Sequence, residues 1–110
     1  MDNKIALSQE VTQLHADLCA ALADPNRLLL LYALAEAPRT VNDLASEVGF
    51  SQPTTSRHLK ILRDHGLAQA VRQGANVEYH LTDLRIIEAL DILRAVLRDR
   101  LAYRASLIES

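Results

Sequence analysis

Short polar and basic side chains are concentrated between residues 51 and 67 of this 110-residue chain. The segment reads SQPTTSRHLKILRDHGL, and small or hydrogen-bonding residues fill its first part. A glutamine such as Gln52 can form two hydrogen bonds with adenine, an arginine such as Arg57 can do so with guanine, and hydroxyl groups are adaptable. The segment therefore predicts contacts with nucleic-acid bases and phosphates. A solvated helix face would look similar, so the neighbouring elements must decide.

Two histidines in the same segment, His58 and His65, raise the question of metal binding or catalysis. They lie seven residues apart on one predicted helix, and no cysteine or acidic cluster is placed to complete a site with them. We therefore expect neither activity there. We expect His58 to pack or to contact DNA, and His65 to interact with the negative end of the helix dipole.

The charge of the chain is unevenly distributed. Its net charge is −2, which at first argues against a nucleic-acid partner. Residues 51–80, however, contain four basic residues against two acidic ones, whereas residues 1–50 contain three against seven. A local basic patch can bind phosphates even when the whole chain is acidic. The excess of positive charge thus coincides with the polar segment and the residues directly after it.

The single cysteine, Cys19, is another candidate for chemistry. It follows His15 by four residues, so both side chains would lie on one side of a helix. A thiol there could pair with its copy in a second chain or react with an oxidant, and a charged His15 would favour the thiolate. We favour the simpler interpretation of a small buried apolar residue. A metal site that His15 and Cys19 share with a partner chain is a further alternative.

Helical spacing of apolar residues predicts the first two helices. The first is expected over residues 7–22. Asp24 is a suitable N-cap and Pro25 suits the first turn of the second helix, which runs to about residue 37. This second helix is apolar nearly all round, so we expect it to be the buried central helix.

Two short helices with a tight turn between them come next. Thr40 is a suitable N-cap for a third helix over residues 41–48, which Gly49 ends. Ser51 caps the fourth helix, which we expect to stop near His65. Two helices arranged in this way are typical of a helix-turn-helix.

A β-hairpin and a long helix complete the chain. Residues 67–72 and 77–81 are expected to form strands, and the QGAN sequence between them is typical of a hairpin tip. Thr82 or Asp83 would cap a last helix that runs to about residue 108.

The order of these elements predicts a single domain over residues 1–110 that is mainly α with a small β-hairpin. It has five helices and a two-stranded wing, the arrangement of a winged helix-turn-helix. The first and last helices carry more apolar surface than a domain of this size can cover alone. We therefore expect the chain to dimerise through these two helices.

Three segments of the chain resemble the ArsR/SmtB family of bacterial repressors. They are ADPNRLLLLYAL in the second predicted helix, SQPTTSRHLKILRDHGL in the fourth and RQGANVEYHL in the hairpin. The segments follow the family's order and spacing, and the resemblance extends over about residues 12–100. It implies a homodimeric winged helix-turn-helix repressor that binds a double-stranded DNA operator and releases it when an inducer binds.

The residues predicted to contact DNA lie on the fourth helix and the wing. Thr55, Leu59 and Leu62 are spaced to face inward, which leaves polar side chains such as Arg63 on the outside and flanks. In the wing, Arg72 is the strongest candidate, and a plain turn is the alternative. The predicted contact set is Ser51, Gln52, Thr54, Thr55, Ser56, Arg57, His58, Lys60, Arg72, Gln73 and Asn76.

The resemblance also indicates which metal sites to look for. One class in the family binds soft metals through two cysteines in a CVCDL sequence, and the matching TVNDL has Thr40 and Asn42 at those positions. A second class binds zinc between the C-terminal helices. At its four ligand positions stand Asp83, Arg85, Val96 and Asp99. Soft-metal sites need thiolates, and an arginine adds charge of the wrong sign. We therefore expect no metal and no cofactor, and Asp83 as a helix cap.

The remaining composition excludes several classes of protein. The chain is 49% hydrophobic and 24% charged, which is ordinary for a folded protein. We find no secretory pattern, no apolar run long enough to span a bilayer and no glycine-rich phosphate loop. We expect a cytoplasmic protein that is not an enzyme and does not bind membranes. The sequence leaves its inducer unknown.

Two alternatives to an inducer-released DNA repressor stay open. One is a winged-helix interaction module that uses the fourth helix for protein contacts. The other is a repressor that senses oxidants through Cys19.

Overall fold

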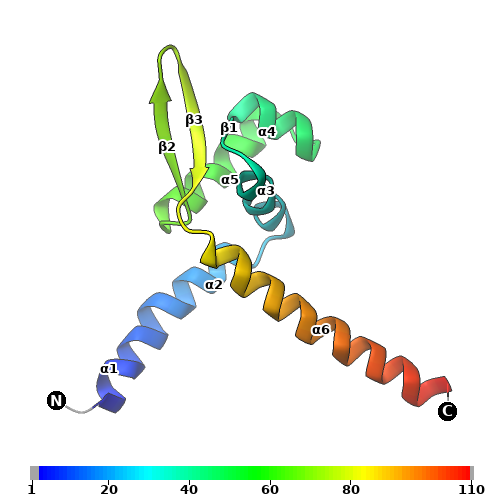
Figure 1. Cartoon of the computed structure of the whole chain (residues 1–110). Coiled ribbons are helices and arrows are strands. Elements are labelled where there is room, and N and C mark those ends of the chain that lie inside the picture. Colours follow the sequence, from blue (N-terminus) through cyan, green and yellow to red (C-terminus); the bar gives the residue numbers. More distant parts are fainter. Residues whose placement is uncertain (1–2, 110) are drawn as a thin grey trace.

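The computed structural model describes residues 3–109, which are mostly helical (Figure 1). In chain order the elements are α1 (Asn3–Glu10), a π-helical turn η1 (Val11–His15), α2 (Ala16–Leu22), α3 (Pro25–Glu36), β1 (Arg39–Thr40), α4 (Val41–Val48), α5 (Gln52–Asp64), β2 (Ala68–Gln73), β3 (Asn76–Leu81) and α6 (Arg85–Glu109). The first three form one continuous helix, called the N-terminal arm below. The described residues thus contain the five helices that the sequence predicts, and the first begins at Asn3 rather than residue 7.

The predicted capping residues begin the helices. A side-chain oxygen of Asp24 accepts a hydrogen bond of 2.8 Å from a backbone N–H two residues on, at the start of α3. The hydroxyl oxygens of Thr40 and Ser51 accept bonds of 3.3 Å from N–H groups three residues on, at the starts of α4 and α5. Each cap satisfies a backbone donor that a helix leaves unpaired. These local bonds fix where the two helices of the helix-turn-helix begin.

Helix α6 begins after Asp83, which the sequence offered as one of two caps. Its Oδ1 accepts a hydrogen bond of 2.9 Å from the backbone N–H of Arg85. The hydroxyl of Thr82 instead donates to the carbonyl oxygen of Gly66 at 2.7 Å. Thr82 therefore ties the end of the hairpin to the end of α5, and Asp83 is the residue that caps α6.

The sheet has three strands in the described part of the chain, one more than the sequence predicts. Its order is β1-β3-β2, and both pairings are antiparallel. Strand β1 places Arg39 opposite Tyr79 and Thr40 opposite Glu78. The sequence predicts no strand at Arg39 and Thr40, because two residues carry no strand pattern of their own.

Strands β2 and β3 form the wing, which closes on the two-residue turn Gly74–Ala75. The last pair of the ladder joins Gln73 and Asn76. Gly74 has a φ of 62°, which residues other than glycine rarely adopt. A glycine at the first central position is typical of a type II′ hairpin turn.

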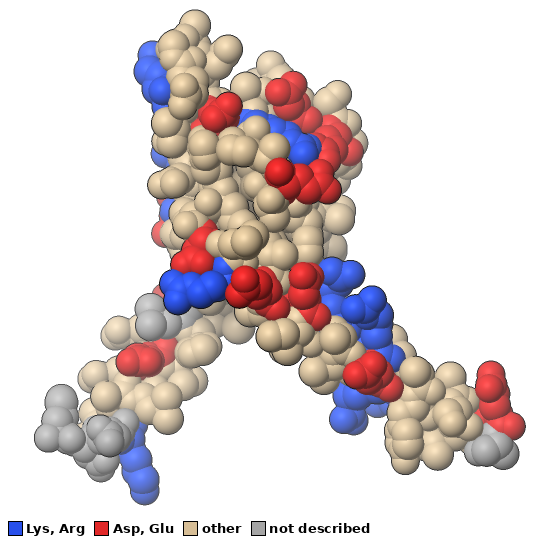
Figure 2. Space-filling model, in the orientation of Figure 1, with Lys and Arg blue, Asp and Glu red and all other residues tan. Residues whose placement is uncertain are grey.

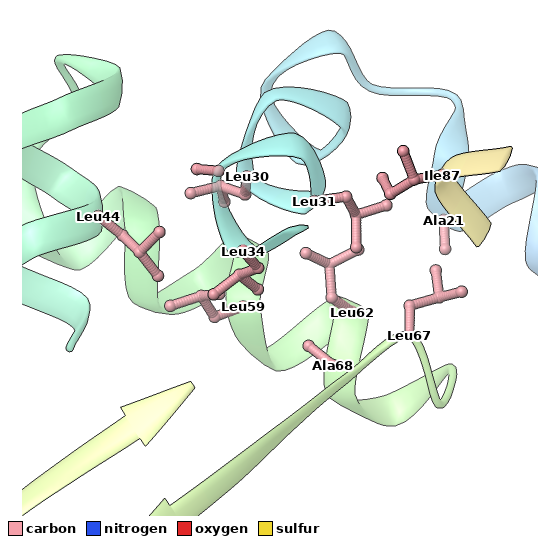
Figure 3. Packing of buried hydrophobic residues seen from close by; sticks show 11 residues of the cluster. Ala21, Leu30, Leu31, Leu34, Leu44, Leu59, Leu62, Leu67, Ala68 and Ile87 are labelled. Atoms are coloured by element: carbon pink, nitrogen blue, oxygen red, sulfur yellow. The ribbon is translucent and has the colours of Figure 1, made fainter. Parts of the chain in front are cut away.

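The core lies where α3, α5 and the base of the wing meet (Figure 3). Leu31 and Leu34 of α3 face Leu59 and Leu62 of α5, and all four are at most 3% exposed. Burying one such side chain stabilises a fold by roughly 1.5–3 kcal/mol. The rest of the labelled cluster consists of Ala21, Leu30, Leu44, Leu67, Ala68 and Ile87. These contacts hold α5 and the wing at a fixed angle to each other.

The N-terminal arm and α6 are long helices that extend away from this core in different directions (Figure 1). The radius of gyration is 17.3 Å, whereas a compact chain of 100 residues has about 13 Å. Near its start, α6 is attached to α3 through the Tyr32 hydroxyl, which donates to Asp91 at 2.7 Å and accepts from Arg94 at 3.0 Å. Beyond that attachment nearly every residue of α6 is exposed to solvent.

Both extended helices expose large apolar side chains. The exposed set comprises Ile5, Leu7, Val11, Ile92, Leu93, Val96, Leu97, Leu101, Tyr103, Leu107 and Ile108. Exposed apolar surface of this extent is rare on monomers and marks an interaction surface. The predicted surplus of apolar surface on the first and last helices is therefore present in the folded chain.

Among residues 3–109, no single helix is long and apolar enough to cross a membrane. Only the bent pair Lys4–Leu22 and Pro25–Glu36 reaches that length and composition, and its second member is the core helix α3.

Candidate nucleic-acid interface

Helix α5 turns its polar side chains to solvent because its leucines are buried. Gln52, Ser56, Arg57 and Lys60 are exposed, as is the capping residue Ser51. Thr54 is half-buried, and its hydroxyl oxygen accepts a hydrogen bond of 2.9 Å from the Ser51 hydroxyl. The N-terminal part of α5 therefore presents hydroxyl, amide and guanidinium groups together, on a helix that the core holds in place.

Two members of the predicted contact set, Thr55 and His58, are buried. Thr55 is 0% exposed, and its hydroxyl donates to the carbonyl oxygen of Ser51 at 2.9 Å. His58 is 7% exposed, and its ring lies 6.4 Å from the ring of Phe50 between centroids. Their burial contradicts the prediction that they contact DNA. His58 instead packs, which was the other expectation for it.

Arg27 connects three helices from a half-buried position that the sequence did not reveal. Its Nε donates to the carbonyl oxygen of Ala21 at 2.6 Å, and a terminal nitrogen donates to that of Ala20 at 3.2 Å. Its other terminal nitrogen lies 3.4 Å from Nδ1 of His58. An arginine on the last carbonyls of a helix satisfies acceptors that the helix leaves unpaired. Arg27 thus joins the N-terminal arm, α3 and the inner face of α5.

The histidine at the other end of α5 behaves as expected. Nδ1 of His65 lies 2.8 Å from the carbonyl oxygen of Ile61, in the last turn of the helix. This places the imidazole at the negative end of the helix dipole.

The wing residues of the predicted set are exposed, and they lie just before and after the turn. Arg72 and Gln73 are the last residues of β2, and Asn76 is the first of β3. The sequence placed all three at the tip, which the structure narrows to the strand ends that flank Gly74–Ala75.

A groove of about 550 Å³ lies between the start of α4, the end of α5 and the wing. Both of its charged lining residues are arginines, Arg63 from α5 and Arg72 from β2. The other lining residues are Thr40, Val41, Asn42, Ala70, Ala75, Asn76, Val77 and Tyr79. The sequence placed Arg63 on the outer side of the helix but left it out of the contact set. No local pattern indicates that it shares a groove with the wing.

The arginines outside the N-terminal arm and α6 differ in whether they form an ion pair with a carboxylate. Arg39 pairs with Glu36 at 3.0 Å and also with Glu47, and Figure 2 shows acidic and basic side chains side by side over α4. The guanidinium groups of Arg57, Arg63 and Arg72, by contrast, form no hydrogen bond or ion pair with any residue that the structure describes. Their charges are therefore available for phosphates.

Lys60 differs from these arginines because it already has a partner. Its ammonium group lies 2.8 Å from Oδ2 of Asp64, and both side chains are exposed. The hydrogen bond from Lys60 is the main cause that lowers the pKa of Asp64. An exposed pair of this kind is weak, so a phosphate can displace the carboxylate.

Known proteins resemble the chain over this same region. Residues 24–70 match the family described as "Bacterial regulatory protein, arsR family". The HTH-type transcriptional regulator NmtR of Mycobacterium tuberculosis is 38% identical over 84 residues, which cover 76% of this chain and 69% of NmtR. The chain belongs to the ArsR/SmtB family.

Other members of the ArsR/SmtB family agree in sequence and in fold. The transcriptional repressor SmtB homolog of Synechocystis is 40% identical over 81 residues, 74% of this chain and 61% of that protein. A homodimeric winged helix-turn-helix DNA-binding domain of Mycobacterium bovis has a TM-score of 0.74 and 29% identity, and covers 94% of this chain and 92% of that domain. This ArsR/SmtB chain is therefore a winged helix-turn-helix, DNA-binding transcriptional repressor, not an enzyme.

The positions of the ArsR/SmtB metal sites carry other interactions here. The hydroxyl of Thr40 caps α4. Asp83 forms an ion pair with Arg85 at 2.7 Å, and hydrogen bonds from Arg85 lower the pKa of Asp83 to about 2. Within the described part of a single chain, no three His, Cys, Asp or Glu side chains gather closely enough to hold a metal.

Cys19 is exposed on the N-terminal arm, and so is His15. In a single chain this contradicts the favoured interpretation of Cys19 as a small buried residue. The reason is that the arm meets the core only near its C-terminal end, at Ala21, so its outward-facing residues have nothing to pack against.

Proposed function

We propose that this ArsR/SmtB chain binds an inverted-repeat operator as a homodimer and represses the adjoining genes until an inducer releases it. Each protomer, a single domain over residues 1–110, would place its α5 in one of two successive major grooves, roughly 34–36 Å apart. We place the protein in the cytoplasm with its DNA.

The observation that carries the DNA-binding proposal is the exposed polar face of α5 beside an unpaired arginine of the wing. Leu59 and Leu62 fix the orientation of that face. With the two buried residues removed, the proposed contacts are Ser51, Gln52, Thr54, Ser56, Arg57, Lys60, Arg72, Gln73 and Asn76. The α5 side chains would contact bases, and those of the wing would contact phosphates or the minor groove.

The homodimer proposal is supported by the exposed apolar faces of the N-terminal arm and α6. The Mycobacterium bovis domain that shares this fold is described as homodimeric. A second copy that covers both helices would remove their apolar side chains from water, which favours association.

The experiment that tests this proposal is selection of bound fragments from a library of genomic DNA, followed by binding to the recovered operator at increasing salt. A repressor of this kind should lose affinity steeply as salt rises, because bound phosphates release counterions. If no fragment is enriched above the library background, the alternative of a protein-interaction module replaces the DNA-binding proposal. The genes beside the recovered operator would narrow the class of inducer.

Release would occur by a shift between dimer geometries. One dimer geometry binds DNA well and the other binds it poorly. An inducer that binds more tightly to the second geometry lowers operator affinity by the difference between its binding free energies for the two. We propose that the inducer is not a soft metal at the start of α4, because Thr40 and Asn42 offer no thiolate.

A second candidate for the release signal is oxidation of Cys19, which its exposure favours. Thiol reagents should then release operator DNA from the wild type but not from Cys19→Ser. Equal release from both proteins would eliminate the redox alternative.

A further inference from the structure

We propose that the groove between α4, α5 and the wing binds one phosphate group, held jointly by Arg63 from the helix and Arg72 from the wing. This inference deepens the proposed function and rests on it for the DNA source of the phosphate. It adds a contact that two elements make together, and it assigns a role to Arg63.

The charge of the groove is the first argument. Its two charged residues are both arginines, and no carboxylate lines it. Two other hollows on the described surface differ: Glu36 and Glu47 line the one between α3 and α4, and Asp17 and Asp64 line the one between the arm and α5. A planar guanidinium matches the geometry of phosphate oxygens and can bind two of them at once.

The neutral lining of the groove suits the same ligand. Asn42 and Asn76 have amide donors, and Thr40 and Tyr79 have hydroxyl groups. A volume of about 550 Å³ lies within the range of small-ligand sites. A phosphate with an attached sugar would thus find both charged and neutral hydrogen-bonding groups in the groove.

The position of Arg63 on α5 links the groove to the base-contacting face. Gln52, Ser56 and Arg63 follow one another at intervals of four and seven residues, so they lie along one flank of the helix. Gln52 and Ser56 are exposed members of the proposed contact set. A DNA strand that passes along this flank would reach the groove at Arg63.

Both arginines stand on elements that are fixed to each other. The N–H of Leu67 donates to the carbonyl oxygen of Leu62 at 2.9 Å, so the base of β2 is bonded to the last turns of α5. Leu62 and Leu67 are also both buried. Both arginines therefore line a groove whose walls are already fixed before binding, which reduces the entropy lost when a phosphate binds.

The phosphate could come from the operator backbone or from a small phosphorylated molecule, and two measurements separate these sources. The first is the salt dependence of operator affinity. Each neutralised phosphate contributes a slope of about −0.9 to the plot of log affinity against log salt. We expect the double variant Arg63→Gln/Arg72→Gln to flatten the slope by about 0.9, since both arginines neutralise one phosphate.

The other outcomes of this measurement overturn the shared site. A flattening of roughly 1.8 in the double variant means two separate phosphates, and an unchanged slope means that the backbone does not use the groove. Arg63→Lys/Arg72→Lys retains the charges and should keep the wild-type slope. Arg85→Gln removes an exposed arginine outside the groove and should also keep it.

The second measurement titrates the DNA-free protein with inorganic phosphate at constant ionic strength, with chloride as the replaced anion. The NMR signals of the arginine Nε–H groups report binding. Saturable shifts at Arg63 and Arg72 alone identify free phosphate as a ligand of the groove. Absence of shifts, together with a flattened salt slope, assigns the groove to the DNA backbone.

The proposal fails if neither measurement responds to the two arginines. If the wild type binds no operator at all, the proposed function fails instead, and the phosphate titration alone then decides whether the groove is an anion site.

Discussion

Arg57 is the exposed arginine nearest the front of α5, and no carboxylate that the structure describes neutralises it. Replacement by glutamine should weaken operator binding by about 1–3 kcal/mol and relax the choice of base at one position, because a bidentate contact with guanine is lost. Fluorescence anisotropy with the selected operator and single-base variants measures both effects. Arg85→Gln is the charge-matched control, and equal losses in the two variants would contradict the assignment.

A second prediction for single residues concerns the Asp83–Arg85 pair and the pH dependence of stability. Arg85 lowers the pKa of Asp83 from 3.8 to about 2, so the folded state binds this proton less tightly than the unfolded chain. The pair's contribution to stability is therefore complete above pH 4 and lost as the pH falls toward 2. The ¹³C signal of the Asp83 carboxyl should titrate near 2 in the wild type and at a higher pH in Arg85→Gln, which keeps only the backbone N–H bond to this carboxyl. A midpoint that does not move would show that the pair does not form in solution.

Single residues also show where the sequence was sufficient and where it was not. Helical spacing already placed Thr55 with Leu59 and Leu62 on the inner face, and its burial follows from that spacing. Thr55 had nevertheless been included among the predicted DNA contacts as a hydroxyl-bearing residue, and its burial contradicts that prediction. Arg63 could not have been found in this way, because its partner in the groove comes from a different element.

At the scale of the elements, Arg27 is the junction to test. Arg27→Ala should lower the free energy of unfolding by about 1–3 kcal/mol, because two carbonyl oxygens at the end of α2 lose their hydrogen-bond donors. Urea denaturation at fixed protein concentration measures this loss. Arg27→Lys should lose less, since an ammonium group can still reach one carbonyl. No loss in either variant would mean that water satisfies these oxygens.

The elements that the sequence predicted correctly are those whose signals are local. Asp24, Thr40 and Ser51 each bond to a backbone N–H two or three residues away, so the starts of three helices are encoded where they occur. Strand β1 was missed because its only strand partner is β3, far along the chain. The π-helical turn at Val11–His15 has no capping or spacing signal either.

For the whole molecule, the prediction concerns association. Leu97 on α6 is 61% exposed and Leu29 on α3 is 52% exposed, so neither supports the core of the single chain. Leu97→Asp should shift the protein from dimer to monomer in sedimentation velocity and abolish operator binding at the same concentration. Leu29→Asp, a matched change on α3 rather than on either extended helix, should stay dimeric. A dimeric Leu97→Asp would place the interface elsewhere.

The two extended helices make repression depend on the concentration of the repressor. The apolar surface of the two extended helices is covered only in the proposed dimer. The fraction of folded, DNA-binding dimer therefore depends on the concentration of the chain. When paired chains are scarce, the number of dimers falls with the square of the number of chains. Growth without new synthesis would then relieve repression faster than simple dilution does, so the operator would respond to the amount of its own repressor with a threshold.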